Sequence, residues 1–256
     1  DMEDYCDAKG LLFRMCEIGC VNADDPWTAR LVKDATCRIL RYSAKGGAEL
    51  RAKNIALFPS CVEFDAVAGA EQARIRLGIP GAFSVYNALG VIQSAQALGI
   101  PLAQIAASLE TAKGVKGRAE VVPTPGKDYT VLIDYSHTPD SLENILNTVR
   151  GFCRGRVIAV FGCGGDRDPF KRPVMGGIAA RLADVAVVTS DNPRTENPDE
   201  IIRQIVAGMK GSEPVVIENR PKAIEWALAH AQKDDVIVLC GKGHETYQEI
   251  GHEKRH

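Results

Sequence analysis

Short apolar runs and longer amphipathic stretches alternate along the second half of the chain, where Gly, Pro and polar residues separate them. The apolar runs predict strands at Tyr129–Asp134, Arg156–Phe161, Val185–Thr189, Val215–Glu218 and Asp235–Cys240. The amphipathic stretches predict helices at Pro139–Phe152, Lys171–Leu182, Pro198–Met209 and Pro221–Ala231. Strands that alternate with helices form βαβ units. We therefore expect an α/β fold with a mostly parallel, Rossmann-like sheet in this half.

The first half mixes helical and extended patterns less regularly. Helices are predicted at Met2–Met15, Pro26–Lys33, Gly81–Leu98 and Pro101–Thr111. Extended segments are predicted at Gly19–Asp25, at Thr36–Tyr42 and, as antiparallel strands, within Asn54–Ala68. The composition shifts toward Pro, Gly and charged residues at Pro123–Asp128. Such a shift indicates a boundary between two domains, there or a few residues earlier.

Composition and charge exclude several classes of protein. Charged residues make up 25% and hydrophobic residues 45% of the 256 residues, as in ordinary globular proteins. The formal net charge of -2 gives no long-range attraction to nucleic acid or to a membrane surface. No apolar run approaches the roughly 20 residues that span a bilayer, and there is no signal peptide. We expect a cytoplasmic protein without nucleic-acid partners or membrane insertion.

The cysteines do not form a recognisable site. The chain has 8 of them, with no CxxC pair and no Cys/His spacing of a zinc site. Several lie in apolar runs, where a free cysteine behaves as a small hydrophobic residue. We expect reduced thiols that take no part in chemistry.

The most informative polar cluster follows the apolar run Asp184–Val188. The segment Asp191–Arg194 reads Asp-Asn-Pro-Arg and lies just past the carboxyl end of the expected strand, where open α/β sheets bind ligands. A carboxylate and a guanidinium three residues apart suit an ammonium and a carboxylate, which predicts an amino acid as ligand. The alternative is a polar turn closed by Asn192-Pro193, with a surface ion pair.

Two further loops follow predicted strands and precede helices. Gly162–Asp168 is glycine-rich and leads into the basic segment Lys171–Pro173, which suits a carboxylate or phosphate. Its spacing matches neither GxGxxG nor GxxxxGK[ST], so a tight turn remains the alternative. Asp134–Asp140 places an acid where ribose hydroxyls are commonly held. Within it, His137 is a candidate for contact with a nucleotide ring or for a hydrogen bond inside the loop.

The last clear strand ends in Gly241–Glu245, a fourth polar loop. Glu245 is a candidate partner of Asp191 in holding a cationic amine, and a solvated loop is the alternative. The carboxyl ends of parallel strands meet at one sheet edge, so we expect all four loops to open on it. Their convergence indicates a single ligand site.

Together, and in this order, the four motifs resemble those of the Mur ligases. Within that family they are similar to the branch that adds meso-2,6-diaminopimelate to UDP-N-acetylmuramoyl-L-alanyl-D-glutamate. The resemblance runs from the first residues to the last. It implies the C-terminal part of a central ATP-binding domain at residues 1–122 and a Rossmann-like C-terminal domain at residues 123–256.

The resemblance implies that Asp-Asn-Pro-Arg marks the use of diaminopimelate, whose distal end carries one ammonium and one carboxylate. The residues implied to bind this substrate are Arg167, Asp191, Asn192, Arg194, Gly241 and Glu245. Lysine lacks the distal carboxylate and would leave Arg194 unpaired, which disfavours lysine as substrate.

ATP and Mg²⁺ are also implied by the resemblance. Asp4–Phe13 is similar to the family segment whose lysine is carbamylated, so Lys9 is expected to be catalytic and to hold Mg²⁺ as a carbamate. Without the resemblance, Lys9 is an ordinary surface lysine. The residues implied to contact the nucleotide are Asn87, Arg118, Asp134 and His137.

The implied reaction is ATP-dependent amide synthesis for peptidoglycan precursors. The side-chain carboxylate of D-glutamate attacks the γ-phosphate of ATP, and the amine of diaminopimelate then displaces phosphate from the resulting acyl phosphate. We expect a monomeric enzyme.

The chain departs from the family pattern because it has no GTNGKT-like phosphate loop, and it opens in a helical pattern without an initiator Met. We therefore expect it to be cut from a longer protein and to be inactive alone. One other interpretation is a diaminopimelate-binding module without catalysis. Another is a related ligase of the same fold that adds L-lysine or resembles folylpolyglutamate or cyanophycin synthetase, against which the motifs at Asp191–Arg194 and Gly241–Glu245 argue.

Overall fold

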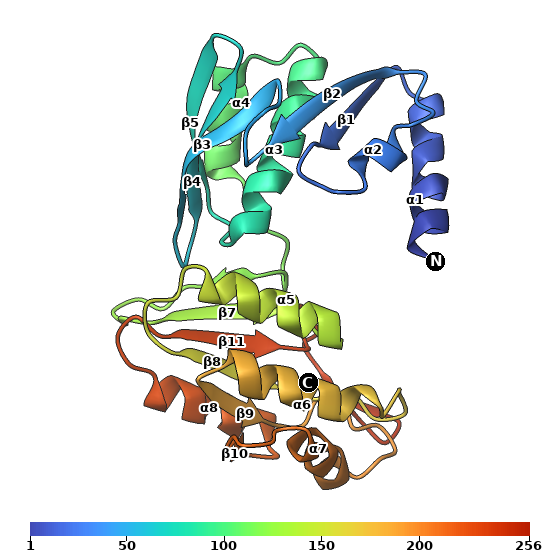
Figure 1. The fold of residues 1–256 in the computed structure, drawn as a ribbon. Helices are drawn as coiled ribbons and strands as arrows, with labels where there is room; N and C mark the ends of the chain where they lie inside the picture. The colour runs from blue at the N-terminus through green and yellow to red at the C-terminus, as the bar shows by residue number, and fades with distance from the viewer. The chain divides into compact units, whose positions relative to one another are not determined.

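Two large β-sheets and a two-stranded hairpin organise the chain, and the computed structural model describes all 256 residues, Asp1–His256. One unit comprises residues 1–57 and 61–113, and the other comprises residues 58–60 and 114–256. In Figure 1 the first unit is coloured from blue to green and most of the second from yellow to red. Each unit contains its own sheet and its own helices.

The sheet of the first unit has the strand order β1-β2-β3-β4-β5. Its strands are β1 (Ile18–Asn22), β2 (Arg38–Ser43), β3 (Leu50–Leu57), β4 (Val62–Ala68) and β5 (Glu71–Leu77). The pairs among β1, β2 and β3 are parallel, and those among β3, β4 and β5 are antiparallel. The helices are α1 (Met2–Gly10), the 3-10 helix η1 (Leu11–Arg14), α2 (Thr28–Leu31), α3 (Ala82–Ala97) and α4 (Leu102–Thr111). Apolar side chains of α3 and α4 share one core with β3, β4 and β5.

Two elements of the first unit differ from the sequence prediction. The α-helix expected over Met2–Met15 ends at Gly10, and the chain continues as η1. Glycine weakens a helix, and a side chain at this position would lie 2.9 Å from the carbonyl oxygen of Leu31. Strand β5 is absent from the prediction, although Ile75 and Leu77 are buried and Arg74 and Arg76 are exposed in alternation.

The sheet of the second unit has the order β10-β9-β8-β11-β7-β6. Its strands are β6 (Glu120–Val122), β7 (Thr130–Asp134), β8 (Val157–Phe161), β9 (Val185–Val188), β10 (Val215–Val216) and β11 (Val236–Cys240). All neighbours are parallel except β6 and β7. The helices are α5 (Pro139–Arg150), α6 (Lys171–Leu182), α7 (Pro198–Ala207) and α8 (Arg220–His230). The predicted α/β architecture with a mostly parallel sheet is confirmed.

Helices cover both faces of this sheet. Helix α8 packs Ala223 and Ala227 against Ile158 and Val160 of β8. Successive side chains of a strand point to opposite faces, so the other residues of β8 face the side that α5 and α6 cover (Figure 1). Every residue of β8 is buried, as is typical of a parallel strand enclosed on both sides.

Two strand pairings of the second unit are absent from the strands predicted from the sequence. Strand β6 pairs antiparallel with β7. The chain enters this unit at Gly114, a few residues before the boundary that the resemblance implies between residues 122 and 123. After the last parallel strand, the chain forms a hairpin of β12 (Gln248–Ile250) and β13 (Glu253–Arg255). The hairpin is not predicted from the sequence.

Candidate functional site

Four loops meet at the carboxyl edge of the second sheet, as expected for parallel strands. They follow β7, β8, β9 and β11 and enclose a cavity of about 680 Å³. The cavity is lined by Tyr135, His137, Thr138, Pro139, Gly162, Gly164, Arg167, Asp168, Phe170, Lys171, Val174, Asp191, Asn192, Arg194, Gly241 and Glu245. Its size suits a small ligand rather than a macromolecule.

The cavity brings together all the residues expected to bind the amino acid. Asp191 and Asn192 are buried, Arg194 and Glu245 are half-buried, and Arg167 is exposed. Gly241 approaches Asp191 closely, since a side chain at Gly241 would lie 2.5 Å from Asp191 Oδ2. The geometry places these residues together, and their individual roles remain predictions.

Asn192, Lys242 and Glu245 form a hydrogen-bonded cluster beside the cavity. Lys242 Nζ donates to Asn192 Oδ1 at 2.6 Å and to Glu245 Oε2 at 3.1 Å. Asn192 Nδ2 donates to Glu245 Oε2 at 3.1 Å, and Tyr135 Oη donates to Glu245 Oε1 at 3.3 Å. Burial acts to raise the pKa of Glu245, but the hydrogen bonds from Asn192 and Lys242 outweigh it and lower that pKa. Glu245 is therefore a fixed, ionised acceptor at neutral pH.

Asp191 has a different environment from Glu245. Its Oδ2 atom is buried and has no hydrogen-bond partner. The nearest cationic atom is Nη1 of Arg220, which is also buried without a partner and lies 3.9 Å away, beyond hydrogen-bond distance. Arg220 Nη2 donates to the carbonyl oxygen of Cys240 at 2.6 Å. Asp191 thus keeps a nearby counter-charge and retains acceptor capacity for a ligand ammonium.

Arg194 supplies the positive charge on the same side of the sheet. Its backbone is left-handed, with a φ of 50°, which is uncommon for a residue other than glycine. Its Nε donates to Glu249 Oε2 at 3.0 Å, and its Nη1 donates to the carbonyl oxygen of Gly165 at 2.8 Å. A guanidinium has five N–H donors, so further donors remain for a carboxylate in the cavity.

The glycine-rich loop packs directly against the loop that carries Asp191 and Arg194. A side chain at Gly162 would overlap the carbonyl oxygen of Thr189, and one at Gly165 would overlap the carbonyl oxygen of Pro193. Gly165 N also donates to the carbonyl oxygen of Asn192 at 2.9 Å. These two glycines therefore serve the contact between two loops, in addition to any close approach to a ligand.

Three of the residues expected to contact a nucleotide already contact neighbouring groups of the protein. Asp134 accepts hydrogen bonds from Ala119 N at 2.8 Å and from Ser136 N at 2.9 Å, and also from Ser136 Oγ. His137 Nδ1 lies 2.8 Å from the carbonyl oxygen of Tyr135, which favours a hydrogen bond inside the loop over contact with a nucleotide ring. His137 also lines the cavity. The exposed guanidinium of Arg118 lies over the ring of Tyr135, 5.0 Å from its centroid.

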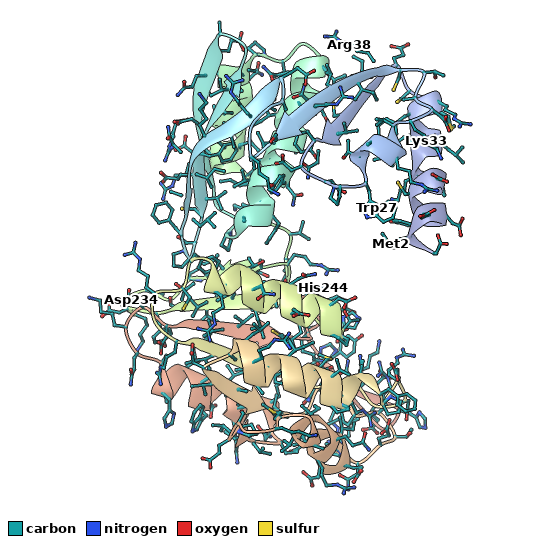
Figure 2. The ribbon with its side chains drawn as sticks, viewed as in Figure 1. Met2, Trp27, Lys33, Arg38, Asp234 and His244 are labelled. Atoms are coloured by element: carbon teal, nitrogen blue, oxygen red, sulfur yellow. The ribbon has the colours of Figure 1, made fainter.

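Lys9 and Asn87 lie in the first unit. Lys9 is exposed, with its Nζ 5.4 Å from the ring centroid of Tyr5, and it lines a second cavity of about 370 Å³. Met2 and Trp27, labelled in Figure 2, line the same cavity. Asn87 is exposed on α3. No group of three or more His, Cys, Asp or Glu side chains is arranged to hold a metal ion.

Several residues at the site are missing from the sequence prediction. Lys242 belongs to a motif that the sequence highlights, and its spacing of three residues from Glu245 is a signal for an ion pair. His244, labelled in Figure 2, lies between Lys242 and Glu245 in the same loop, and its ring centroid lies 5.7 Å from that of Tyr135. Arg220 and Glu249 have no local signal, because their partners come from distant segments. Arg172 lies in the basic segment expected to suit a carboxylate or phosphate, and in the structure its guanidinium is buried and paired with Glu196.

Two domain profiles match the chain. The Mur ligase middle domain matches residues 1–95, and the Mur ligase, glutamate ligase domain matches residues 117–243.

Curated relatives extend this match along the chain. The UDP-N-acetylmuramoyl-L-alanyl-D-glutamate--2,6-diaminopimelate ligase of Caldanaerobacter subterraneus subsp. tengcongensis is 48% identical over 253 residues, 98% of this chain and 52% of that protein. The ligase 1 of that name from Clostridium acetobutylicum is 44% identical over 255 residues, 99% of this chain and 53% of that protein. The chain thus spans about half the length of the curated relatives it matches.

Solved structures agree with these matches. The structure of a UDP-N-acetylmuramoyl-L-alanyl-D-glutamate--2,6-diaminopimelate ligase has a TM-score of 0.76 and 31% identity, over 100% of this chain and 54% of that one. Folylpolyglutamate synthase of Thermotoga maritima has a TM-score of 0.67 at 19% identity, over 87% of this chain and 50% of that one, which shows a common fold alone. None of the helices here is both long enough and apolar enough to span a membrane.

Proposed function

This chain belongs to the Mur ligase family, and we propose that it is part of an ATP-dependent ligase that joins meso-2,6-diaminopimelate to UDP-N-acetylmuramoyl-L-alanyl-D-glutamate. Its relatives at 44% and 48% identity carry the name of that reaction. The proposal includes a monomeric, cytoplasmic enzyme of peptidoglycan precursor synthesis. The reaction activates the side-chain carboxylate of D-glutamate as an acyl phosphate, which the amine of diaminopimelate then attacks.

The observation that supports this proposal is the distribution of charge around the cavity. Carboxylates of Asp191 and Glu245 and the guanidinium of Arg194 line one cavity at the carboxyl edge of the sheet. An amino acid with a zwitterionic end presents an ammonium to the first two residues and a carboxylate to the third. Diaminopimelate has such an end, and the ε-ammonium of lysine lacks the neighbouring carboxylate.

We assign a role to each of the residues that line this cavity. Arg194 binds the distal carboxylate of diaminopimelate, and Asp191 and Glu245 bind the distal ammonium. Asn192 and the backbone at Gly241 fix the outline of the pocket. Arg167, exposed at the cavity, adds positive charge toward carboxylate or phosphate groups.

The nucleotide contacts belong to the same proposal. Asp134 has one hydrogen bond on its Oδ2 atom and keeps acceptor capacity there for a ribose hydroxyl. Arg118 supplies positive charge for phosphates, and Asn87 and His137 are assigned to the nucleotide by family resemblance alone. Lys9 is assigned to Mg²⁺, as a carbamate, by family resemblance alone; it is exposed at the second cavity, where a carbamate would be one oxygen donor beside water ligands. When bound, Mg²⁺ would neutralise phosphate charge.

Competition between two amino acids tests the proposed function. A full-length protein that contains this chain is assayed for phosphate release with ATP and the nucleotide substrate, in the presence of meso-diaminopimelate or L-lysine. We expect kcat/KM to favour diaminopimelate by about a hundredfold or more, because lysine leaves the charge of Arg194 without its ligand partner. The variant R194A should lower kcat/KM for diaminopimelate by about 10- to 100-fold and change that for lysine little. Preference of the unmodified protein for lysine would refute the assignment.

A further inference from the structure

Strand β12 of the C-terminal hairpin lies against the loop that carries Asp191 and Arg194. Gln248 Nε2 donates to the carbonyl oxygen of Asp191 at 2.6 Å, and Glu249 N donates to Asn192 Oδ1 at 2.9 Å. The backbone is joined as well, because an isolated parallel bridge links Arg194 to Ile250. A segment outside the four cavity loops therefore contacts three residues of the site.

Glu249 holds the guanidinium of Arg194 from one side. Its Oε2 accepts the Nε–H of Arg194 at 3.0 Å, and the carbonyl oxygen of Gly165 accepts an Nη1–H at 2.8 Å. With Nε engaged, the free donors of Arg194 lie on its two terminal nitrogens. A carboxylate can bind that end of the planar group through two N–H donors.

The same residue also secures the backbone of Arg194. Arg194 N donates to the carbonyl oxygen of Glu249 at 3.0 Å, and Gly251 N donates to the carbonyl oxygen of Arg194 at 2.7 Å. These bonds flank a left-handed residue, with φ at 50°, whose conformation must be maintained by its surroundings. Both the backbone and the side chain of Arg194 are thus held by β12 and the residue that follows it.

We propose that Glu249 is a positioning residue of the diaminopimelate site, which orients Arg194 so that its terminal nitrogens meet the distal carboxylate of the ligand. This inference rests on the proposed function. It adds a residue from the C-terminal hairpin to the determinants of specificity between diaminopimelate and lysine. Glu249 itself does not contact the ligand in this assignment.

Calorimetric titration of the 256-residue chain with meso-diaminopimelate and, separately, with L-lysine tests the proposal. The variant E249A should raise the Kd for diaminopimelate about tenfold and leave the Kd for lysine unchanged, because only diaminopimelate uses Arg194. The variant E249Q retains an acceptor oxygen for the Nε–H and should stay within about threefold of the unmodified chain. A purely structural role for Glu249 would weaken both ligands alike.

Glu253 provides the matched control. It lies in β13 of the same hairpin and is exposed, and its side chain pairs only with Arg255, at 3.6 Å. The variant E253A should bind both ligands as the unmodified chain does. If E249A binds diaminopimelate as tightly as E253A does, Glu249 does not position Arg194.

Two measurements separate this inference from the proposed function. If R194A weakens diaminopimelate binding and E249A does not, the inference fails and the site assignment stands. If neither R194A nor E249A changes binding, the site assignment fails as well.

Independently of any ligand, the Nε–H resonance of Arg194 should exchange more slowly with solvent in the unmodified chain and in E249Q than in E249A. Equal exchange in all three proteins would overturn the positioning role.

Discussion

The buried guanidinium of Arg172 shows how single residues keep the cavity loops in place. Its Nη1 and Nη2 donate to Glu196 Oε2 at 2.9 Å and Oε1 at 2.8 Å in a two-bond fork. Nη1 also donates to Gln204 Oε1 at 2.8 Å, and Nη2 donates to the carbonyl oxygen of Gly164 at 3.3 Å. One side chain therefore joins α6, α7, the glycine-rich loop and the segment that follows Arg194.

Replacement of Arg172 should be among the more costly substitutions outside the apolar core. We expect R172A to lower the free energy of unfolding by about 2 to 4 kcal/mol, because Glu196 loses a close charged partner and Gln204 loses its donor. The control R203A removes an exposed pair between Arg203 and Glu200 on α7 and should cost less than about 1 kcal/mol. Urea denaturation at pH 7 measures both values, and equal losses would contradict the importance of the buried fork.

Acid should reduce the difference between R172A and the unmodified chain. The hydrogen bond from Arg172, opposed by burial, holds the pKa of Glu196 below its ordinary value of 4.5. A carboxylate with a lowered folded-state pKa contributes stability that is fully present above its unfolded-state pKa and is lost as the pH falls through the folded-state value. The difference in unfolding free energy should therefore be largest near neutral pH and shrink below pH 4.5. A difference that stays constant into acid would point to lost packing instead.

At the scale of elements, α6 and α7 approach each other through glycines. A side chain at Gly176 would overlap the carbonyl oxygen of Ile205 in α7. A side chain at the next residue, Gly177, would lie 3.4 Å from the carbonyl oxygen of Gly208, an ordinary contact distance. Of these two adjacent glycines in α6, therefore, only Gly176 is required by the packing against α7.

Alanine at these two positions should have opposite effects. Both substitutions gain helix propensity, by up to about 1 kcal/mol each. We expect G177A to stabilise the protein by about 0.5 to 1 kcal/mol, since its methyl group meets no obstacle. In G176A the overlap with α7 should outweigh that gain and give a net loss of about 1 to 3 kcal/mol. Thermal denaturation of both variants measures these effects, and an unchanged or raised Tm in G176A would exclude a tight contact between α6 and α7 at this position.

The elements also show which features a sequence pattern predicts. The buried strands β8 and β11 are continuous apolar runs, and the amphipathic helices α5 and α7 have a clear helical period. The polar loops after the strands predict the acidic and basic residues of the cavity. By contrast, β12 has only three residues, and contacts with Asp191–Arg194 define its position. The same reason explains why Glu249 and Arg220 cannot be found from local sequence, and why the basic segment Lys171–Pro173 does not reveal that Arg172 pairs with Glu196. Their partners lie more than 20 residues away or are fixed by tertiary packing.

At the scale of the whole molecule, β6 decides where the second unit begins. It pairs Glu120, Val121 and Val122 with Ile133, Leu132 and Val131 of β7. Just before it, Ala119 is buried, and its N–H is one of the donors to Asp134. The Pro- and Gly-rich stretch at Pro123–Asp128 therefore lies inside this unit, between two strands of one sheet.

Two truncated chains should distinguish the structural boundary from the one expected from sequence. Residues 114–256 should fold alone and bind meso-diaminopimelate within about twofold of the 256-residue chain, because all the residues that line the larger cavity belong to this segment.

Residues 123–256 lack β6 and the donor at Ala119, and they leave β7 as an unpaired edge. We expect this shorter segment to lose at least about 2 kcal/mol of stability, from the missing ladder hydrogen bonds and the exposed edge. Calorimetric binding and urea denaturation of both segments provide the comparison. Equal stability would move the boundary to residue 123, and loss of binding in 114–256 alone would show that the ligand site requires the first unit.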